Sequence, residues 1–328
     1  MINPDAHLRE DWEQPAEEAA TRDGFGTGVL DAGKDDERVM VVCADLTEST
    51  RTDKFKEAYP DRFIEAGITE QHMAGLGSGL AAAGKVPFIA SYAAFNPGRN
   101  YEQVRTTIAL NQQPVIIAGC HAGVSVGPDG ATHQMLEDIG LMRMLPNMTV
   151  VAPADAEEAR KATLAAAAFG KPIYLRFGRE KTPVFTTPET PFEIGKAITL
   201  WDDAAPQVAI ITTGALAHHA LRAASELEES GIRSLVLNNH TIKPMDEAAV
   251  LAAAKKAGAV VTVEEHQIMG GMGSAVAELL AREHPVPVEF VGVHDVFGQS
   301  GKPDELIAHY GMDTPHIVTA ARKVIVRK

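Results

Sequence analysis

The sequence contains almost no cysteine. Only Cys43 and Cys120 occur among its 328 residues, each inside an apolar stretch. This scarcity excludes a small secreted scaffold held together by disulfides. Two isolated thiols of this kind are typical of buried side chains in a reducing compartment, and we expect no disulfide between them.

Basic charge and long apolar runs are also scarce. Lysine and arginine total 30 against 44 aspartate and glutamate residues, a formal net charge of -14, whereas a nucleic-acid-binding protein needs a basic surface. A small anionic ligand is still permitted, because a local Arg and His cluster can lie inside an acidic protein. No apolar run approaches a membrane span, and the N-terminal residues 1–24 are too acidic for a signal peptide. We expect a soluble, cytoplasmic protein without nucleic-acid or membrane partners.

Several motifs that carry known chemistry are missing. The chain has no P-loop lysine pattern, no H-E-x-x-H spacing for zinc and no G-x-S-x-G elbow for a serine hydrolase. Two glycine-rich stretches occur, at 75–79 and 268–274. Neither has the full dinucleotide-binding pattern, which places its glycines at a strand-to-helix turn and an acidic residue about 20 positions later. We interpret both stretches as structural, the first as part of a closely packed helix.

The sequence does contain a regular alternation of short apolar runs with amphipathic or alanine-rich segments. In its first half it predicts strands at 38–46, 86–92, 114–120, 148–153 and 172–177, and helices at 69–84, 100–112, 132–145 and 155–170. Asp155 and Gly170 supply the last helix with an N-cap signal and a C-terminal signal. This βαβ rhythm predicts a parallel sheet covered by helices.

Residues 178–196 interrupt the rhythm with several prolines and no helical period, which is typical of a linker. The alternation then resumes, with strands at 207–214, 233–239, 259–265 and 288–293 and helices at 215–231, 245–258, 270–283, 303–311 and 314–325. The predicted fold class is therefore α/β, with two consecutive α/β domains at 14–185 and 193–328, the second smaller. His218 and His219 fall in a predicted helix, and we interpret them as a solvated face.

One loop gathers polar side chains directly after the strand at 114–120. His121, Asp129 and His133 surround the turn sequence GPDGAT. Loops at the carboxyl ends of strands are where α/β domains bind ligands, so this loop predicts a binding site. Two histidines and an aspartate are also possible zinc ligands, but their spacing is not that of a compact metal motif.

Longer segments of the chain resemble a known family. Residues 65–95, which contain GITEQHM and SYAAF, and residues 121–158, which contain DGATHQ, resemble the pyrimidine-binding domain of transketolases. The end of the chain, with VFGQSGKPDELIAHYG, resembles their C-terminal domain. The pairing of G-I-T-E with D-G-A-T-H-Q is specific to transketolases and the related deoxyxylulose-phosphate synthases. The resemblance implies that the domains at 14–185 and 193–328 are these two domains and that the cofactor is thiamine diphosphate.

The resemblance assigns four side chains to the cofactor. Glu70 matches the catalytic glutamate that binds N1′ of the aminopyrimidine, although its local sequence alone suggests a helix-capping carboxylate. Tyr92 and Phe95 match the aromatic pocket for that ring. Tyr101 would be a third aromatic, in a stretch, NPGRNYEQ, that departs from the family pattern.

The resemblance also implies contacts to a sugar phosphate. Arg22, Ser49 and Arg179 match contacts to its phosphate, with Arg176 close enough in sequence to replace Arg179. His121 matches the phosphate end, and Asp129 and His133 match contacts to the sugar hydroxyls and carbonyl. The two histidines would also be catalytic, as donors to developing oxyanions and in proton transfer.

The family's diphosphate-binding motif is missing. Transketolases hold the diphosphate and a divalent metal through a G-D-G motif followed by an asparagine, and no G-D-G occurs in this chain. The resemblance therefore implies the C-terminal subunit of a split transketolase with no metal site of its own. An N-terminal subunit would carry the diphosphate and Mg²⁺ site, and two copies of each subunit would form a heterotetramer. The implied reaction moves a two-carbon ketol unit from a ketose phosphate to an aldose phosphate, as in the pentose phosphate pathway.

Three alternatives share parts of this pattern. The beta subunit of a 2-oxo-acid dehydrogenase has the same layout, but it would leave unexplained Arg22, Asp129, His133 and Arg179. A subunit of a deoxyxylulose-phosphate synthase-like enzyme would act on pyruvate. A non-catalytic regulatory subunit would have no need of Glu70 and His133.

Overall fold

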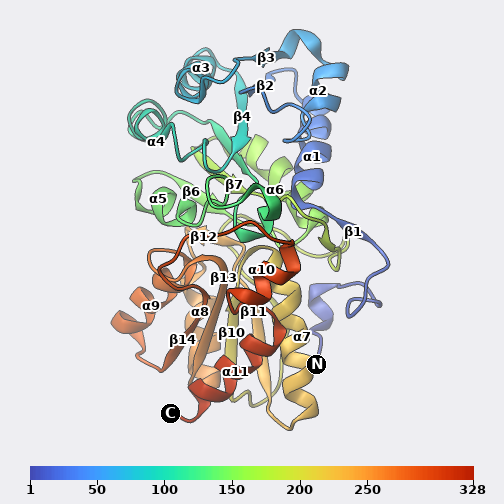
Figure 1. Ribbon diagram of the computed structural model, residues 1–328, viewed down its shortest axis with the longest axis vertical. Coiled ribbons are helices and arrows are strands. Elements are labelled where there is room, and N and C mark those ends of the chain that lie inside the picture. The colour runs from blue at the N-terminus through green and yellow to red at the C-terminus, as the bar shows by residue number, and fades with distance from the viewer.

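In the computed structural model, which describes residues 1–328, the apolar runs form two mainly parallel sheets, one above the other in Figure 1. The upper sheet has seven strands in the order β12-β6-β7-β5-β4-β2-β3. Its parallel strands are β2 (Val39–Cys43), β3 (Phe63–Glu65), β4 (Val86–Tyr92), β5 (Ile116–Cys120), β6 (Thr149–Val151) and β7 (Ile173–Arg176). Their central residues are nearly all apolar because helices cover both faces.

Each face of the upper sheet has its own helices. On one face, α1 (Thr21–Asp35) and α6 (Ala156–Phe169) pack together, and Phe25 and Ala162 join strand side chains in one apolar cluster. The other face is covered by α3 (Glu70–Ala82), α4 (Tyr101–Gln103), the π-helical turn η3 (Val104–Ala109) and α5 (Asp138–Met144). The connection from β2 to β3 contains α2 (Asp53–Ala58) and η2 (Pro60–Arg62).

The lower sheet has five strands in the order β14-β13-β10-β11-β9. The strands are β9 (Ile198–Trp201), β10 (Val208–Thr212), β11 (Ser234–Asn238), β13 (Val260–Gln267) and β14 (Val288–Val293), and only β9 is antiparallel to its neighbour. One face is covered by α7 (Ala217–Glu229) and α11 (Thr314–Ile325), the other by α8 (Glu247–Ala257) and α9 (Met272–Glu283). The shorter elements are η5 (Gly214–Leu216) before α7 and α10 (Pro303–His309) after β14.

Two α/β units in succession confirm the predicted fold class. The helix predicted at 132–145 begins only at Asp138, because His133 and Gln134 donate their backbone N–H groups to the carbonyl oxygen of Gly130 in turns. The helix predicted at 100–112 is divided into α4 and η3. The sequence did not predict α1, whose TRDGFGTGVL start lacks a clear apolar period. The linker region carries only β8 (Thr182–Pro183), which pairs with β1 (Glu18–Ala19).

The two units exchange segments across their boundary. β12 (Thr241–Lys243) follows the second unit's β11 in sequence, yet it pairs antiparallel with β6 of the upper sheet. The N-terminal segment, with η1 (Pro4–Ala6), instead lies on the second unit, where Trp12 meets the ring of Trp201 at 5.9 Å between centroids. Figure 1 accordingly shows the N-terminus beside α7. A single apolar cluster of 32 buried residues runs through both units, so they share a core.

The N-terminal segment corrects the interpretation of two histidines. His218 is only 7% exposed, and its Nε2 lies 2.9 Å from the carbonyl oxygen of Trp12. His219 Nδ1 lies 3.1 Å from Thr314 Oγ1. Burial lowers the pKa of His218 and lowers that of His219 to about 4. The predicted solvated face is therefore wrong, because the N-terminal segment covers His218 and Thr314 of α11 contacts His219.

The cysteines are placed as the sequence predicted. Cys43 and Cys120 are both free and buried, and burial raises the pKa of each thiol. None of the helices combines the length and the apolar character that a membrane crossing requires.

Candidate active site

Glu70 opens α3 at the carboxyl end of β3. A turn at Gly67, which has a φ of +68°, redirects the chain so that the helix starts three residues later. The side chain of Glu70 is only 2% exposed, although first-turn carboxylates usually face water. The Nη1 of Arg99 donates to its Oε2 at 2.8 Å, and the Asn100 side chain donates to its backbone oxygen at 3.1 Å. Glu70 is thus a buried carboxylate whose one hydrogen-bond partner is a cation from the surface.

An aromatic cluster lies at the carboxyl ends of β4 and β5. Because these strands are parallel neighbours, Tyr92 and Cys120 are paired residues, and the loops that follow them meet. The rings of Tyr92 and Phe95 are nearly parallel at 5.9 Å between centroids. His121 stacks on Tyr92 at 3.8 Å, and His133 presents its edge to Phe95 at 5.5 Å. The structure therefore brings together four rings that are separated in the sequence.

His121 is held as a neutral donor. It is 1% exposed and has a φ of 56°, which turns the chain sharply after β5. Arg22 Nη1 lies 3.2 Å from its Nε2, and because a guanidinium can only donate, this nitrogen accepts. Burial and the charges of Arg22, Arg179 and Arg51 lower the pKa of His121 to about 2. The proton of the neutral ring is therefore on Nδ1, a buried atom without a partner in the chain.

Two arginines provide positive charge beside His121. Arg22, in the first turn of α1, donates from Nη1 to the backbone oxygen of Ser49 at 3.0 Å, while its buried Nε has no partner. Arg179 donates to the backbone oxygen of Val126 at 2.6 Å and lies 3.6 Å from the exposed Asp129. Burial lowers the pKa of Arg22, as does the neighbouring charge of Arg51. A half-buried guanidinium with a free N–H is a suitable contact for a phosphate or another oxyanion.

Arg176 lies away from this site. Its Nε donates to the buried Asp138 at 2.8 Å, and its Nη2 donates to the backbone oxygen of Glu265 at 2.8 Å. It therefore belongs to the seam between the two sheets, and Arg179 is the arginine that reaches the loop of Asp129.

Tyr101 is not brought to the aromatic cluster. Its hydroxyl donates to the backbone oxygen of Leu141 at 3.2 Å, and its ring packs against the core shared by the two units. The position nearest to Glu70 is taken by Arg99, which the sequence analysis did not single out. The signal that could have found it is its place four residues after Phe95, in a tight Asn-Pro-Gly turn.

The glycine-rich stretches serve the fold. At Gly77 a Cβ would lie 2.7 Å from Ile89, as expected for close packing, whereas Gly75 and Gly79 face open space. In the second stretch, the N–H groups of Met272 and Gly273 donate to the Glu264 carboxylate at 2.7 and 2.8 Å. A Cβ at Gly271 would lie 2.2 Å from that carboxylate. The chain's own glutamate therefore fills this helix N-terminus.

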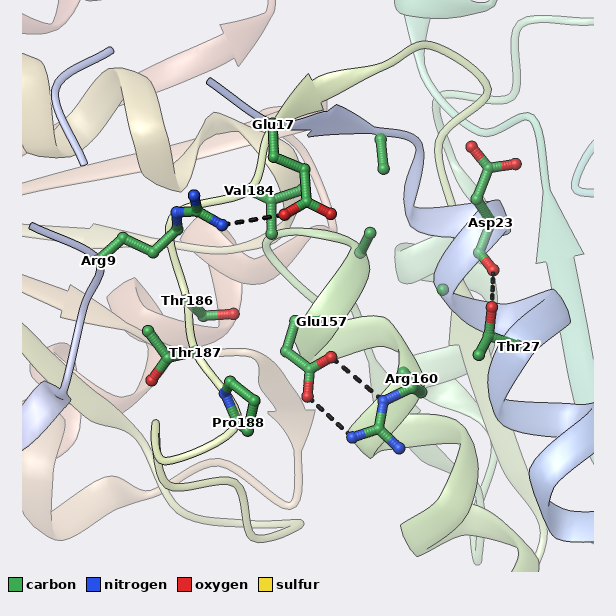
Figure 2. Close-up of a pocket in the computed structure, with 13 residues that line it drawn as sticks. Arg9, Glu17, Asp23, Thr27, Glu157, Arg160, Val184, Thr186, Thr187 and Pro188 are labelled. Atoms are coloured by element: carbon green, nitrogen blue, oxygen red, sulfur yellow. Dashed lines mark hydrogen bonds and ion pairs between the residues drawn. The ribbon is translucent and has the colours of Figure 1, made fainter. Parts of the chain in front are cut away.

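A separate cavity of about 380 Å³ lies between α1, the start of α6 and the linker (Figure 2). Its arginines are already paired within the chain, Arg9 with Glu17 at 2.9 Å and Arg160 with Glu157 at 3.0 Å. Its lining includes neither Glu70 nor any ring of the aromatic cluster. No group of three or more His, Cys, Asp or Glu side chains is arranged to hold a metal ion.

Comparisons with known proteins agree with this geometry. Residues 17–184 match the family described as transketolase, pyrimidine binding domain, and residues 195–317 match transketolase, C-terminal domain. A 6-deoxy-6-sulfo-D-fructose transketolase subunit from a Clostridium species is 38% identical over 98% of this chain and 99% of its own length. An apulose-4-phosphate transketolase subunit from Phocaeicola vulgatus is 37% identical over 93% and 97%. A solved structure described as a split gene transketolase, inactive beta4 tetramer, is 41% identical, with a TM-score of 0.87 over 94% of this chain and 98% of that one.

Proposed function

The chain belongs to the transketolase family, and on this premise we propose that it is the C-terminal, pyrimidine-binding subunit of a split transketolase. Residues 14–185 would be its pyrimidine-binding domain and 193–328 its C-terminal domain. Two relatives named as transketolase subunits match it over nearly their whole lengths, which supports its assignment as this type of subunit. The observation that carries the proposal is the buried Glu70, which Arg99 links to Phe95, one of two nearly parallel rings.

The residues around Glu70 fit the pyrimidine end of thiamine diphosphate. A flat aminopyrimidine needs an aromatic face and a carboxyl group at its N1′, and Phe95 and Glu70, both in contact with Arg99, offer them. When bound, thiamine diphosphate supplies the nucleophilic carbon and the electron sink for cleaving a carbon–carbon bond. Glu70 would hold a proton at N1′, a task that suits a carboxyl group shielded from water.

Two histidines would donate hydrogen bonds to the oxygen atoms of the substrate. The free Nδ1–H of His121 is a fixed donor for a hydroxyl or a developing oxyanion, because the ring is stacked on Tyr92 and stays neutral over the physiological range. His133, at the edge of the same cluster, would donate on the carbonyl side and move a proton there. Asp129, exposed at the neighbouring turn, would accept from sugar hydroxyls.

The substrate's anionic end would lie on Arg22 and Arg179, with Ser49 beside them. We propose that the donor is a ketose phosphate, the acceptor is an aldose phosphate, and a two-carbon ketol unit is transferred. The named relatives act on a sulfonated and a phosphorylated sugar. Both groups are tetrahedral oxyanions that a guanidinium binds in the same way, so the arginines select an anionic terminus rather than one sugar.

The other half of the active site would come from a partner chain. The chain has no G-D-G motif, so we propose that an N-terminal subunit supplies the diphosphate and Mg²⁺ site. Two copies of each would assemble as a heterotetramer. The solved relative that contains only this type of subunit is described as inactive, which supports the need for a partner.

The decisive test is the Glu70→Gln variant in complex with the N-terminal subunit. Glutamine keeps the size of the side chain but cannot share a proton with N1′, so ketol transfer between sugar phosphates should fall by roughly 10²–10⁴-fold. Light scattering should show the same assembly as for wild type. Glu48→Gln, an exposed carboxylate, is the matched control and should keep full activity. Unimpaired transfer by Glu70→Gln would exclude the proposed role, and pyruvate decarboxylation by the wild-type complex would favour a synthase-like enzyme.

A further inference from the structure

Arg99 makes two contacts that together resemble those of a flat nitrogen heterocycle. Its Nη1 donates to Glu70 Oε2 at 2.8 Å, and its guanidinium carbon lies 4.4 Å from the centroid of the Phe95 ring. A guanidinium is planar, donates N–H groups in its plane and stacks on aromatic rings. An aminopyrimidine bound by the same carboxyl group and the same ring would need this position.

The loop that carries Arg99 is anchored without its side chain. Asn96 Nδ2 donates to the backbone oxygens of Ile89 and Ala118 at 3.1 and 3.3 Å. Asn100 Nδ2 donates to Asn96 Oδ1 at 3.0 Å as well as to the backbone of Glu70. Both asparagines are fully buried. The loop and the start of α3 would therefore keep their places if the Arg99 side chain moved.

The two members of the ion pair differ in exposure. The side chain of Arg99 is 47% exposed, while that of Glu70 is 2% exposed. A long side chain at the surface can rotate into water at little cost, because water solvates the cation it releases. The buried carboxylate cannot do the same, and losing its only partner would leave it uncompensated until another donor arrives.

From this geometry we propose that Arg99 is a placeholder for the cofactor, which covers Glu70 and Phe95 in the unassembled subunit and is displaced when the aminopyrimidine binds. This inference rests on the proposed function. It gives Arg99 the role of a positioning residue that sets how tightly the pyrimidine end is held. It also explains why the carboxylate of Glu70 can be buried before the partner chain and its cofactor are present.

The ion pair itself can be tested on the chain alone. The guanidinium protons of Arg99 should exchange slowly with water in the wild-type chain. In Glu70→Gln, the side-chain ¹⁵N and ¹H signals of Arg99 should move to the positions of free arginine. Arg105, exposed on the following helical turn, should be unaffected. If Arg99 has free-arginine signals in wild type, the placeholder is excluded, whatever reaction the protein catalyses.

The displacement can be tested on the complex with the N-terminal subunit, by calorimetric titration of thiamine diphosphate. Arg99→Ala should bind the cofactor on the order of five-fold more tightly than wild type, since a partly exposed ion pair no longer competes. Arg99→Lys, which pairs with Glu70 but cannot stack flat on Phe95, should lie between the two, and Arg105→Ala should match wild type. Equal or weaker binding by Arg99→Ala would overturn the inference. Absence of binding to every complex, wild type included, would overturn the proposed function and this inference with it.

Discussion

The two mainly parallel sheets differ in what the polar side chains at the carboxyl ends of their strands contact. In the upper sheet, the side chains after β4 and β5 leave donors free, such as the buried Nδ1 of His121 and the Nε of the nearby Arg22. In the lower sheet, Asn238 of β11 and Glu265 of β13 bond within the chain, although the Nδ2 of Asn239, directly after β11, is also buried without a partner. Asn238 donates to Glu158 at 2.9 Å, and Glu265 accepts from the backbone N–H of Ser125 at 2.6 Å.

The bonds of the lower sheet largely lead to the upper unit. Ser125 and Glu158 both belong to it, as does Gly140, whose N–H donates to His266 Nε2 at 3.3 Å. Glu264 is the exception, since it fills the N-terminus of its own helix α9. In open α/β sheets this edge usually holds a ligand. Here the edge of the second sheet contacts the first unit instead. The same α/β architecture can therefore form either a ligand site or an interface between two units.

The largest effect is expected at the buried ion pair of the seam. Arg176→Met should lower the free energy of unfolding by about 3–5 kcal/mol, because it leaves the carboxylate of Asp138 buried without its cation. Arg176 holds the pKa of Asp138 below its usual range although burial opposes this. Urea unfolding at neutral pH measures the loss.

A second ion pair across the seam is the matched control. Arg143 and Glu278 lie 2.6 Å apart, but Glu278 is 62% exposed, so Arg143→Met should cost no more than about 1 kcal/mol. Equal losses in the two variants would show that burial is not what distinguishes the seam from the surface.

An intermediate effect is expected at Glu158, where burial raises the pKa to about 7. In the unfolded chain the carboxyl group ionises near pH 4.5, while in the folded protein it keeps its proton to about pH 7. This contribution to stability is therefore complete below pH 4.5 and is lost as the pH rises through 7. The loss amounts to about 3 kcal/mol of unfolding free energy.

Glu158→Gln should remove this pH dependence, since glutamine does not titrate. It should also cost about 1 kcal/mol at low pH, because one of the two N–H donors of Ala154 and Asn238 loses its acceptor. Urea unfolding from pH 4 to 8 gives both numbers. Glu157→Gln, at the neighbouring position, should keep the wild-type dependence of the unfolding free energy on pH. If the unfolding free energy of Glu158→Gln depended on pH as strongly as that of wild type, Glu158 would not be the group that titrates.

The smallest effect is expected at Glu264, whose partners are within the second domain. Glu264→Ala should lower stability by about 1–2 kcal/mol, because two N–H groups at the start of α9 lose their acceptor. Added formate should restore part of the melting temperature of this variant by binding the exposed helix N-terminus, and it should not raise that of wild type. A melting temperature unchanged by the substitution would contradict the capping role.

Much of the fold could be predicted from the sequence. The apolar runs and their spacing predicted the strands around Val41, Ile89 and Ile117, since a buried parallel strand has a strong local signature. Helix α1 and the late start of α5 were missed, because Gly24, Gly26 and the turns after Gly130 suit tertiary contacts rather than a local period. At Gly24, for example, a Cβ would lie 2.0 Å from the backbone oxygen of Ala156.

The sequence predicted most residues of the candidate site but not how they are arranged in space. Glu70, Tyr92, Phe95 and His133 were named from motifs; in the structure the three rings lie together, and Arg99 links Glu70 to the ring of Phe95. Arg99 was missed and Tyr101 was placed elsewhere, because both depend on how the turn at Asn96 and Asn100 is anchored. No spacing in the sequence records those hydrogen bonds.

The sequence by itself determined two successive α/β units and the identity of the side chains that can do chemistry, because periodicity and residue type are local properties. Only the tertiary structure decided which polar groups stay free. It buried His218 under the N-terminal segment, committed Arg176 and Glu265 to the seam, and covered Glu70 with Arg99. The reason is physical: a buried polar side chain is available to a ligand when it has no partner in the chain or when that partner can be displaced, and here many partners come from segments distant in sequence.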